Sequence, residues 1–141
     1  MKTLKLATLA LVAATGVAVL APTAEANKHG KAPASCPALN VIDPDGDGAM
    51  TLLEAYRAAI RTFRKINPDG DMTLEADELA GRMSKAAIAS ADRNKDGRLS
   101  LGEYLREVRN RFNYANPDKD RTIECDELHS KYGRLLARLL N

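Results

Sequence analysis

Oxygen-bearing side chains recur at a fixed spacing in this chain, and the first group of them could surround one metal ion. Asp43, Asp45 and Asp47 stand at alternate positions, and Glu54 follows after a short run of other residues. A hard cation takes about six to eight oxygen ligands, which a 12-residue loop can supply from positions 1, 3, 5, 7, 9 and 12. Gly48 at position 6 permits the sharp bend that such a loop requires. The stretch therefore predicts a binding site for a hard metal ion.

This pattern resembles the EF-hand loop, and it returns in the same register at three later points. The four stretches are residues 43–54, 67–78, 92–103 and 116–127, called loops 1 to 4 below. Each repeats the residue types that a coordination sphere of oxygens needs, so chance is a poor explanation. Position 7 would contribute its backbone carbonyl. The predicted metal ligands are Asp43, Asp45, Asp47, Ala49, Thr51, Glu54, Asn67, Asp69, Asp71, Thr73, Glu75, Glu78, Asp92, Asn94, Asp96, Arg98, Ser100, Glu103, Asn116, Asp118, Asp120, Thr122, Glu124 and Glu127.

The segments between the loops have room for one helix each, because successive loops begin only 24 or 25 residues apart. Apolar residues recur at helical spacing in the first and third segments, whereas Gly81 loosens the middle one. We therefore expect an all-α fold, a compact EF-hand bundle with four 12-residue metal loops joined by single shared helices. Such helices hold neighbouring loops apart. If they alternate in direction, loop 1 pairs with loop 3 and loop 2 with loop 4, although bends could favour other non-adjacent pairs.

The start of the chain has the pattern of a secretory signal peptide. Lys2 and Lys5 precede an apolar run, and the small residues around Ala26 suit a cleavage site. The run is short for a membrane span, so a retained anchor is the weaker alternative. We expect a signal peptide at 1–26, a flexible N-terminal segment at 27–35 and a four-EF-hand metal-binding domain at 36–141. The predicted location is the periplasm, without membrane association.

Charge and motif content argue against two other function classes. Lys and Arg total 21 against 19 Asp and Glu, for a net charge of +2. The basic residues recur on the polar faces of the expected helices, where they offset the acidic loops, so we expect no nucleic-acid partner. No Ser-His-Asp or Cys-His catalytic pattern is evident, and the acidic clusters are used as ligands. We expect neither an enzyme nor catalytic residues.

The chain has two cysteines, Cys36 and Cys125. In an oxidising compartment an isolated pair suggests a disulfide more readily than a structural zinc site, which takes four ligands. Two free thiols or an intermolecular bridge remain open, because the sequence does not give the distance that a disulfide needs.

The whole length after the predicted signal peptide resembles lanmodulin, a family of bacterial periplasmic lanthanide-binding proteins. The resemblance rests on the export signal, the four loops, the short linkers and proline at loop position 2, in Pro44, Pro68 and Pro117. Proline restricts its own φ and the residue before it, so a metal-free loop has fewer conformations to lose. The resemblance implies up to four sites for lanthanide(III) ions or Ca²⁺, a preference for lanthanides and ordering of the chain on metal binding.

The loops depart from the lanmodulin pattern at position 9, where that family usually carries Asp. Here position 9 holds Thr51, Glu75, Ser100 and Glu124. Loops 2 and 4 keep an acid and are the expected lanthanide sites, with loop 1 intermediate. Loop 3 lacks the proline and has fewer charged ligands, so it is expected to be weakest. Loops 2 and 4 also place Met72 and Arg121 where glycine usually bends the chain, at a cost if those residues need a positive φ.

Two functions follow as hypotheses. The first is a periplasmic EF-hand metal-ion-binding protein, a lanmodulin-like lanthanide carrier or buffer that orders on metal binding. The alternative is a calcium-binding EF-hand buffer or sensor that engages a protein partner through an apolar groove. The expected partners are metal ions, with a periplasmic protein partner and the oligomeric state left open.

Overall fold

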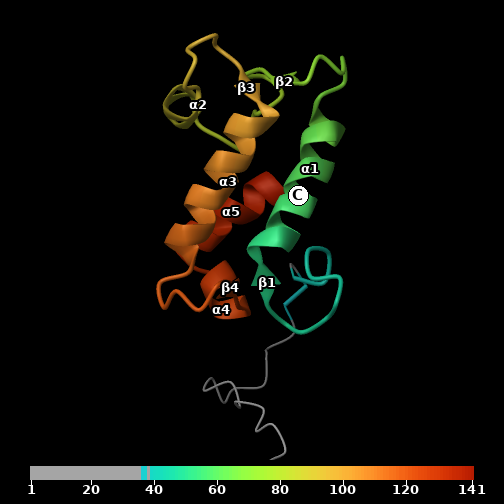
Figure 1. Ribbon diagram of the computed structural model, residues 1–141, viewed down its shortest axis with the longest axis vertical. Coiled ribbons are helices and arrows are strands. Elements are labelled where there is room, and N and C mark those ends of the chain that lie inside the picture. Colours follow the sequence, from blue (N-terminus) through green and yellow to red (C-terminus); the bar gives the residue numbers. More distant parts are fainter. Residues whose placement is uncertain (1–35, 38) are drawn as a thin grey trace, which may run out of the picture. The chain divides into compact units, whose positions relative to one another are not determined.

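The computed structural model describes Cys36, Pro37 and residues 39–141 (Figure 1). The predicted signal peptide and the segment 27–35 lie outside the described residues. No helix in the described part is long and apolar enough to cross a membrane. The elements in chain order are β1 (Met50–Thr51), α1 (Leu52–Ile66), β2 (Thr73–Leu74), α2 (Lys85–Ala91), β3 (Leu99–Ser100), α3 (Leu101–Ala115), β4 (Thr122–Ile123), α4 (Cys125–Leu128) and α5 (Lys131–Leu140).

The predicted all-α class is wrong. The five helices occupy about 49% of the described residues, but two small antiparallel sheets add about 8% strand, which makes the fold mixed α/β. Each loop supplies one short strand, and the residue at loop position 8 is fully buried in all four. Extended backbone that is held against a core must find hydrogen-bond partners outside itself, and here it finds them in another loop. The four buried residues are Met50, Leu74, Leu99 and Ile123.

The predicted pairing of loop 1 with loop 3 and loop 2 with loop 4 is also wrong, although the pair of loops 1 and 4 is one of the non-adjacent pairs that the sequence left open. β1 pairs with β4, with Met50 opposite Ile123, and β2 pairs with β3, with Leu74 opposite Leu99. Loop 1 therefore joins loop 4, and loop 2 joins its neighbour, loop 3. Figure 1 shows the two sheets at opposite ends of α1 and α3.

The middle linker explains the difference, because it does not form one shared helix. Turns follow loop 2, Gly81 adopts φ +76°, and the described linker at 79–91 contains one helix, the seven-residue α2. Ser84 caps that helix by accepting from the Ala87 N–H. A single straight helix would have carried loop 3 to the far end of the domain, whereas this bent linker returns the chain to the end where loop 2 lies. Within the part of the chain that the structure describes, only α1 and α3 each join two loops as a single helix.

Helices α1 and α3 begin and end on predicted metal ligands. Thr51 with Glu54 and Ser100 with Glu103 form capping boxes, in which the position-12 carboxylate and the position-9 hydroxyl bond each other's backbone N–H groups. Both helices end at an asparagine that precedes proline, and Asn116 has the non-helical ψ of +81°. Proline disfavours the helical conformation in the residue before it. The loop sequences thus set the helix boundaries.

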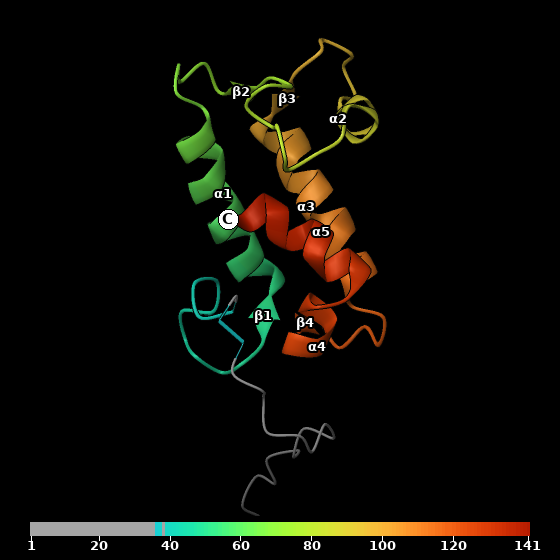
Figure 2. The same ribbon diagram turned by 180° about the vertical axis from the view of Figure 1, so that it is seen from behind.

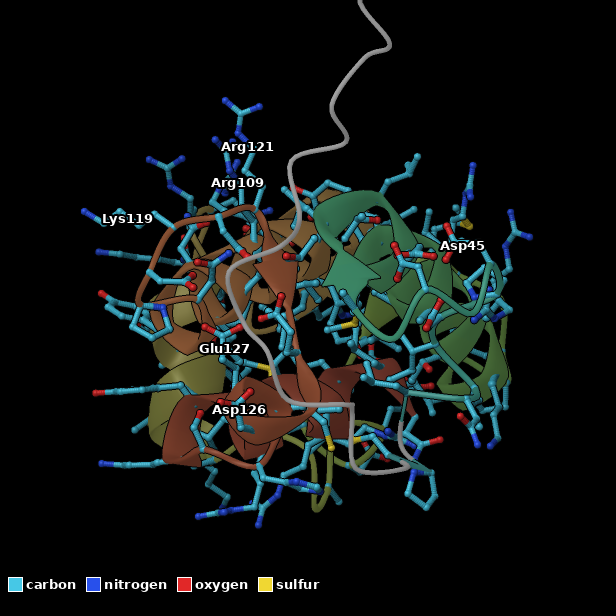
Figure 3. The ribbon with its side chains drawn as sticks, turned by 90° about the horizontal axis from the view of Figure 1, so that it is seen from below. Asp45, Arg109, Lys119, Arg121, Asp126 and Glu127 are labelled. Carbon is cyan, nitrogen blue, oxygen red and sulfur yellow. The ribbon has the colours of Figure 1, made fainter. Side chains whose placement is uncertain are left out.

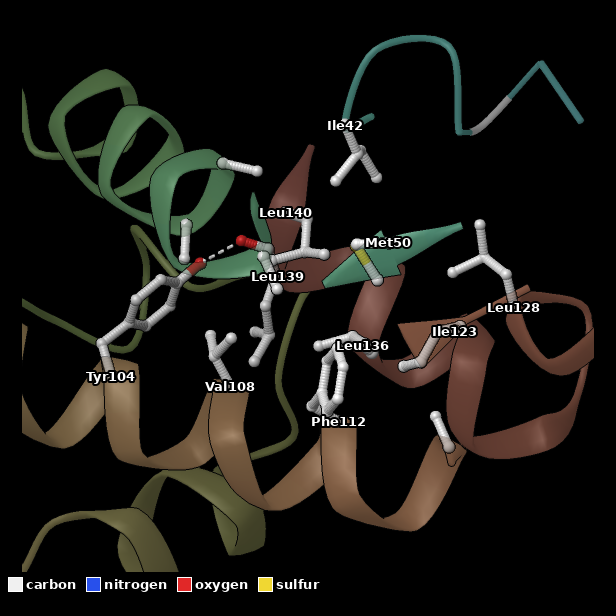
Figure 4. Close-up of a cluster of buried hydrophobic side chains, with 14 of the residues drawn as sticks. Ile42, Met50, Tyr104, Val108, Phe112, Ile123, Leu128, Leu136, Leu139 and Leu140 are labelled. Atoms are coloured by element: carbon white, nitrogen blue, oxygen red, sulfur yellow. Dashed lines mark hydrogen bonds between the residues drawn. The ribbon is translucent and has the colours of Figure 1, made fainter. Parts of the chain in front are cut away.

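The core lies where α1, α3 and α5 meet, and Figure 2 shows α5 lying across the other two helices. The Phe63 and Tyr104 rings make an edge contact with their centroids 5.7 Å apart. The buried Tyr104 hydroxyl donates to the Leu139 carbonyl at 2.6 Å, which ties α3 to the end of α5 (Figure 4). Gly133 lets α5 approach α4, since a Cβ there would lie 2.1 Å from the Glu127 carbonyl oxygen.

Tyr104→Phe tests the contribution of this buried hydrogen bond. We expect the free energy of unfolding to fall by about 1–2 kcal/mol, because the Leu139 carbonyl loses its partner inside the core. Urea unfolding of metal-free protein measures the change. Tyr114→Phe is the control, since Tyr114 is 67% exposed and should change little. Equal stability of the two variants would contradict the assignment.

Candidate metal centres

All four loops share one backbone conformation, although their sequences differ. Positions 4 and 6 have positive φ in every loop. Loop 1 places glycine at both positions, loops 2 and 3 at one each, and loop 4 at neither. The residues at position 4 are Gly46, Gly70, Lys95 and Lys119, and those at position 6 are Gly48, Met72, Gly97 and Arg121. Met72 and Arg121, for which the sequence left the need for a positive φ open, adopt left-handed backbone at φ +71° and +84°.

A second shared feature is the hydrogen bond that positions the last predicted ligand. In each loop the backbone N–H of position 9 donates to Oε2 of the glutamate at position 12. The distances are 2.8 Å for Thr51 to Glu54, 3.0 Å for Glu75 to Glu78, 3.0 Å for Ser100 to Glu103 and 3.2 Å for Glu124 to Glu127. The glutamate is thereby turned back over its own loop, as a closing ligand must be.

Loop 1 draws three carboxylates together. Asp43, Asp45 and Asp47 each place an oxygen within 4.8 Å of the others. Asp43 is buried, and it accepts the Gly46 N–H at 2.8 Å and the Gly48 N–H at 2.9 Å. The pKa of Asp45 is raised, first because its carboxyl shares a hydrogen bond with Asp43. Crowded carboxylates of this kind favour either a proton or a cation between them.

Loop 2 forms the second acidic group, and a cationic side chain already contacts it. Asp69, Asp71 and Glu75 lie within 4.8 Å of one another. Arg98 reaches across from loop 3 and pairs with Asp71 at 2.9 Å and with Glu75 at 3.1 Å. The sequence predicted only the Arg98 carbonyl as a ligand and missed the role of its side chain. That role follows from the pairing of loops 2 and 3, which the sequence did not predict.

Loop 3 is closed by its own hydrogen bonds. Glu103 Oε1 accepts the Arg93 N–H at 2.8 Å, while Oε2 accepts the Ser100 hydroxyl at 2.7 Å. These bonds lower the pKa of Glu103 to about 2, with the Ser100 hydroxyl as the largest cause. Asp92 accepts two further N–H groups, from Lys95 and Gly97. Both oxygens of the closing glutamate are thus engaged within the loop.

Loop 4 contains an unsatisfied buried acceptor. Asn116 at position 1 is 5% exposed, and its Oδ1 has no hydrogen-bond partner within the described structure. Its Nδ2 donates to the position-7 carbonyl of Thr122 at 2.8 Å, so two predicted ligands converge. Burial and then the Glu124 carboxyl raise the pKa of Glu127 to about 8. Figure 3 shows Lys119 and Arg121 at the periphery of this loop, with Glu127 inside it.

Loop 2 repeats the convergence seen in loop 4. Asn67 donates from Nδ2 to the Thr73 carbonyl at 2.7 Å, and its Oδ1 accepts the Gly70 N–H at 2.6 Å. Position 1 contributes a side-chain amide and position 7 a backbone carbonyl, and the two lie together in both loops that begin with asparagine.

The two cysteines, one before loop 1 and one at position 10 of loop 4, lie near one another. Both are free and buried, so the structure contains adjacent thiols where the sequence left a disulfide open. One ligand atom from each of Cys36, Cys125 and His129 lies within 4.8 Å of the others. The Cys36 thiol, followed by burial, raises the pKa of Cys125 to about 11.

Arg121→Gly tests the backbone strain in loop 4. A non-glycine residue in left-handed backbone costs roughly 1–2 kcal/mol, and glycine returns about 0.4–1 kcal/mol through the greater freedom of the unfolded chain. We expect the metal-free protein to gain up to about 1 kcal/mol in unfolding free energy. Arg121→Ala is the matched control, because it removes the charge and keeps the strain. If both variants unfold at the same urea concentration, left-handed strain at this position is negligible.

Comparison of the chain with protein-family models gives no match, and a search of curated proteins finds no significant similarity.

Proposed function

We propose that the protein binds hard metal ions through its four loops and acts as a periplasmic lanthanide carrier or buffer similar to lanmodulin. The observation that carries this proposal is the buried, unpartnered Oδ1 of Asn116 at position 1 of loop 4. A buried carbonyl oxygen without a partner costs about 1–3 kcal/mol, so such an atom normally has a ligand. This one lies where an EF-hand loop presents its first ligand to the ion.

The chemistry of the donors supports a hard ion. Within the loops the predicted ligands are oxygens only, from carboxylates, amides, hydroxyls and backbone carbonyls. Calcium and other hard cations select such ligands, whereas soft ions prefer sulfur. The pKa values of three loop carboxyls are raised: that of Asp45 chiefly by the hydrogen bond it shares with Asp43, and those of Glu75 and Glu127 chiefly by desolvation and then by a neighbouring carboxyl. A cation held among these carboxyls would favour their charged form.

Charge supports a trivalent ion at three of the loops. Loops 1, 2 and 4 each carry four carboxylates among their predicted ligands, whereas loop 3 carries three. Coulomb attraction to a given set of carboxylates scales with the charge of the ion, so each added carboxylate favours a trivalent over a divalent cation. Loops 2 and 4 have their extra acid at position 9, in Glu75 and Glu124. Loop 1 has the same number of carboxylates but no acid at position 9, so by the resemblance to lanmodulin we assign lanthanide preference first to loops 2 and 4.

Calcium sensing with a protein partner is the second candidate, and an apolar surface beside loop 2 favours it. Met72 is 63% exposed and borders a cavity of about 140 Å³ whose lining includes Ile60, Phe63 and Leu101. A sensor exposes such a surface when calcium binds. An apolar dye that fluoresces more strongly with calcium-loaded than with metal-free protein would favour this candidate, whereas unchanged fluorescence favours the carrier.

A paired metal titration tests the proposal. Metal-free protein is titrated with buffered lanthanum and separately with buffered calcium, and helix content is followed by circular dichroism. We expect the transition at far lower free lanthanum than free calcium. In a Glu75→Gln, Glu124→Gln variant the lanthanum midpoint should rise about tenfold, equivalent to about 1.4 kcal/mol. The calcium midpoint should rise less, because a divalent ion loses less attraction per removed charge.

Asp77→Asn, Asp126→Asn is the matched control for that variant. Both residues stand at loop position 11, next to the closing glutamate and outside the predicted ligand set. The control removes the same formal charge from the same two loops, so it should leave the lanthanum midpoint nearly unchanged. Equal midpoints for lanthanum and calcium in the wild-type protein would contradict the proposed selectivity. Equal shifts in the two variants would show that position 9 does not contact the ion.

Arg98→Gln tests the competition between a side-chain cation and a metal at loop 2. The Arg98 side chain is 50% exposed, and ion pairs of this kind contribute about 0.2–1 kcal/mol. Its removal should tighten metal binding at loop 2 by about 2- to 5-fold, measured by calorimetry at low salt. Arg93→Gln serves as the control, since no ion pair joins Arg93 to loop 2 among the described residues. Weaker binding in Arg98→Gln would contradict the competition.

A further inference from the structure

A second group of candidate ligands has different chemistry from the predicted oxygen ligands, although one member, Cys125, stands at position 10 of loop 4, which is outside the predicted ligand set. Cys36, Cys125 and His129 supply two thiols and an imidazole, with one ligand atom from each within 4.8 Å of the others. Thiolate and imidazole are ligands for soft and borderline ions, and they are poor ligands for lanthanides and calcium. The four-loop function does not use these three residues.

Two of the three ligands are fixed on one helical turn. The His129 N–H donates to the Cys125 carbonyl at 3.1 Å, so the residues are one turn apart at the end of α4. This spacing puts both side chains on the same helix face. Cys125 Sγ lies 3.6 Å from His129 Nδ1. Zinc bonds of about 2.3 Å to sulfur and about 2.0–2.1 Å to nitrogen place the two atoms roughly 3.5 Å apart around a tetrahedral ion.

The third ligand is held in place by the turn that precedes loop 1. The Cys36 carbonyl accepts the Leu39 N–H at 2.9 Å, and the Ile42 N–H donates to the Leu39 carbonyl at 2.7 Å. Leu39 and Ile42 are both buried in the core, which anchors this turn. The Cys36 side chain therefore approaches α4 from a segment distant in sequence. Both cysteines are buried, whereas His129 is exposed and leaves the group accessible from solvent.

We propose that Cys36, Cys125 and His129 form a binding site for one thiophilic d¹⁰ cation, Zn²⁺ or Cu⁺. Three protein ligands leave a fourth position open for water on zinc and complete a three-coordinate sphere for copper(I). Binding replaces the two thiol protons with metal–sulfur bonds and involves no change in oxidation state. The bound ion would tie the turn at Cys36 to α4.

Cobalt(II) is the probe that separates this site from the oxygen loops. Reduced protein under anaerobic conditions is titrated with cobalt(II), and thiolate-to-cobalt charge transfer is read in the near ultraviolet, where oxygen ligands do not contribute. We expect the band to saturate at one ion per chain. Zn²⁺ and Cu⁺ are then added in separate arms, each against a chromophoric chelator, to identify which ion displaces cobalt.

Substitutions identify the ligands. Cys36→Ser and Cys125→Ser should each weaken the thiolate band and lower affinity, and the double variant should abolish the band. His129→Gln lies on the surface, so it should fold normally and lower affinity by about tenfold or more, the scale of a lost coordinating contact. Asp47→Asn, which removes a loop 1 carboxylate, is the control and should leave the cobalt band unchanged. Circular dichroism checks that each cysteine variant is folded.

Two results would overturn the site. One is the absence of a thiolate band in reduced wild-type protein. The other is a band that persists in the folded Cys36→Ser, Cys125→Ser variant. A mass lower by two hydrogens before reduction, combined with no cobalt band after it, would instead assign the cysteines to a disulfide.

Discussion

The hydrogen bond from the position-9 N–H to the position-12 glutamate is the interaction on which the rest of this structure depends. It recurs in all four loops at 2.8–3.2 Å, and it serves two purposes. In loops 1 and 3 the same carboxylate completes a capping box and so starts α1 or α3. It also turns toward the loop, where it would close a metal site. A change at Glu54 or Glu103 therefore acts on helix stability and on coordination at once.

The register of the loops could be read from the sequence because it depends on local chemistry. Oxygen ligands, bending residues and prolines occupy fixed positions, and the structure keeps left-handed backbone at position 6 even where Met72 and Arg121 replace glycine. The boundaries of α1 and α3 follow from the same signals. Each helix begins at a capping residue and ends at the asparagine that precedes proline in the next loop. The sequence also allowed the two cysteines to be near one another.

The arrangement of the loops depends on tertiary contacts and was not predicted. In the sequence, Gly81 indicated a weakened helix in the middle linker. A weakened helix and a turn that reverses the chain have similar local composition, so the sequence did not separate them. Burial of Leu74 against Leu99 favours the turn, because it brings β2 and β3 together. The error in fold class has a similar origin. Two-residue strands carry no periodicity, and their pairing is visible only when both loops are placed. The Arg98 contact with loop 2 was inaccessible for the same reason.

The two sheets differ in the length of chain that separates their strands, and this has a consequence for the order of folding. Thr73 and Ser100 are near in sequence, whereas the partners Met50 and Ile123 lie almost at opposite ends of the described domain. Loop closure costs more entropy as the separation grows, and contacts of high sequence separation form late. During synthesis the sheet of β2 and β3 can form while the ribosome still holds the last helices. Met50 gains its partner Ile123 only after the final part of the chain has emerged. A chain whose synthesis stops early would therefore leave the apolar strand of loop 1 exposed.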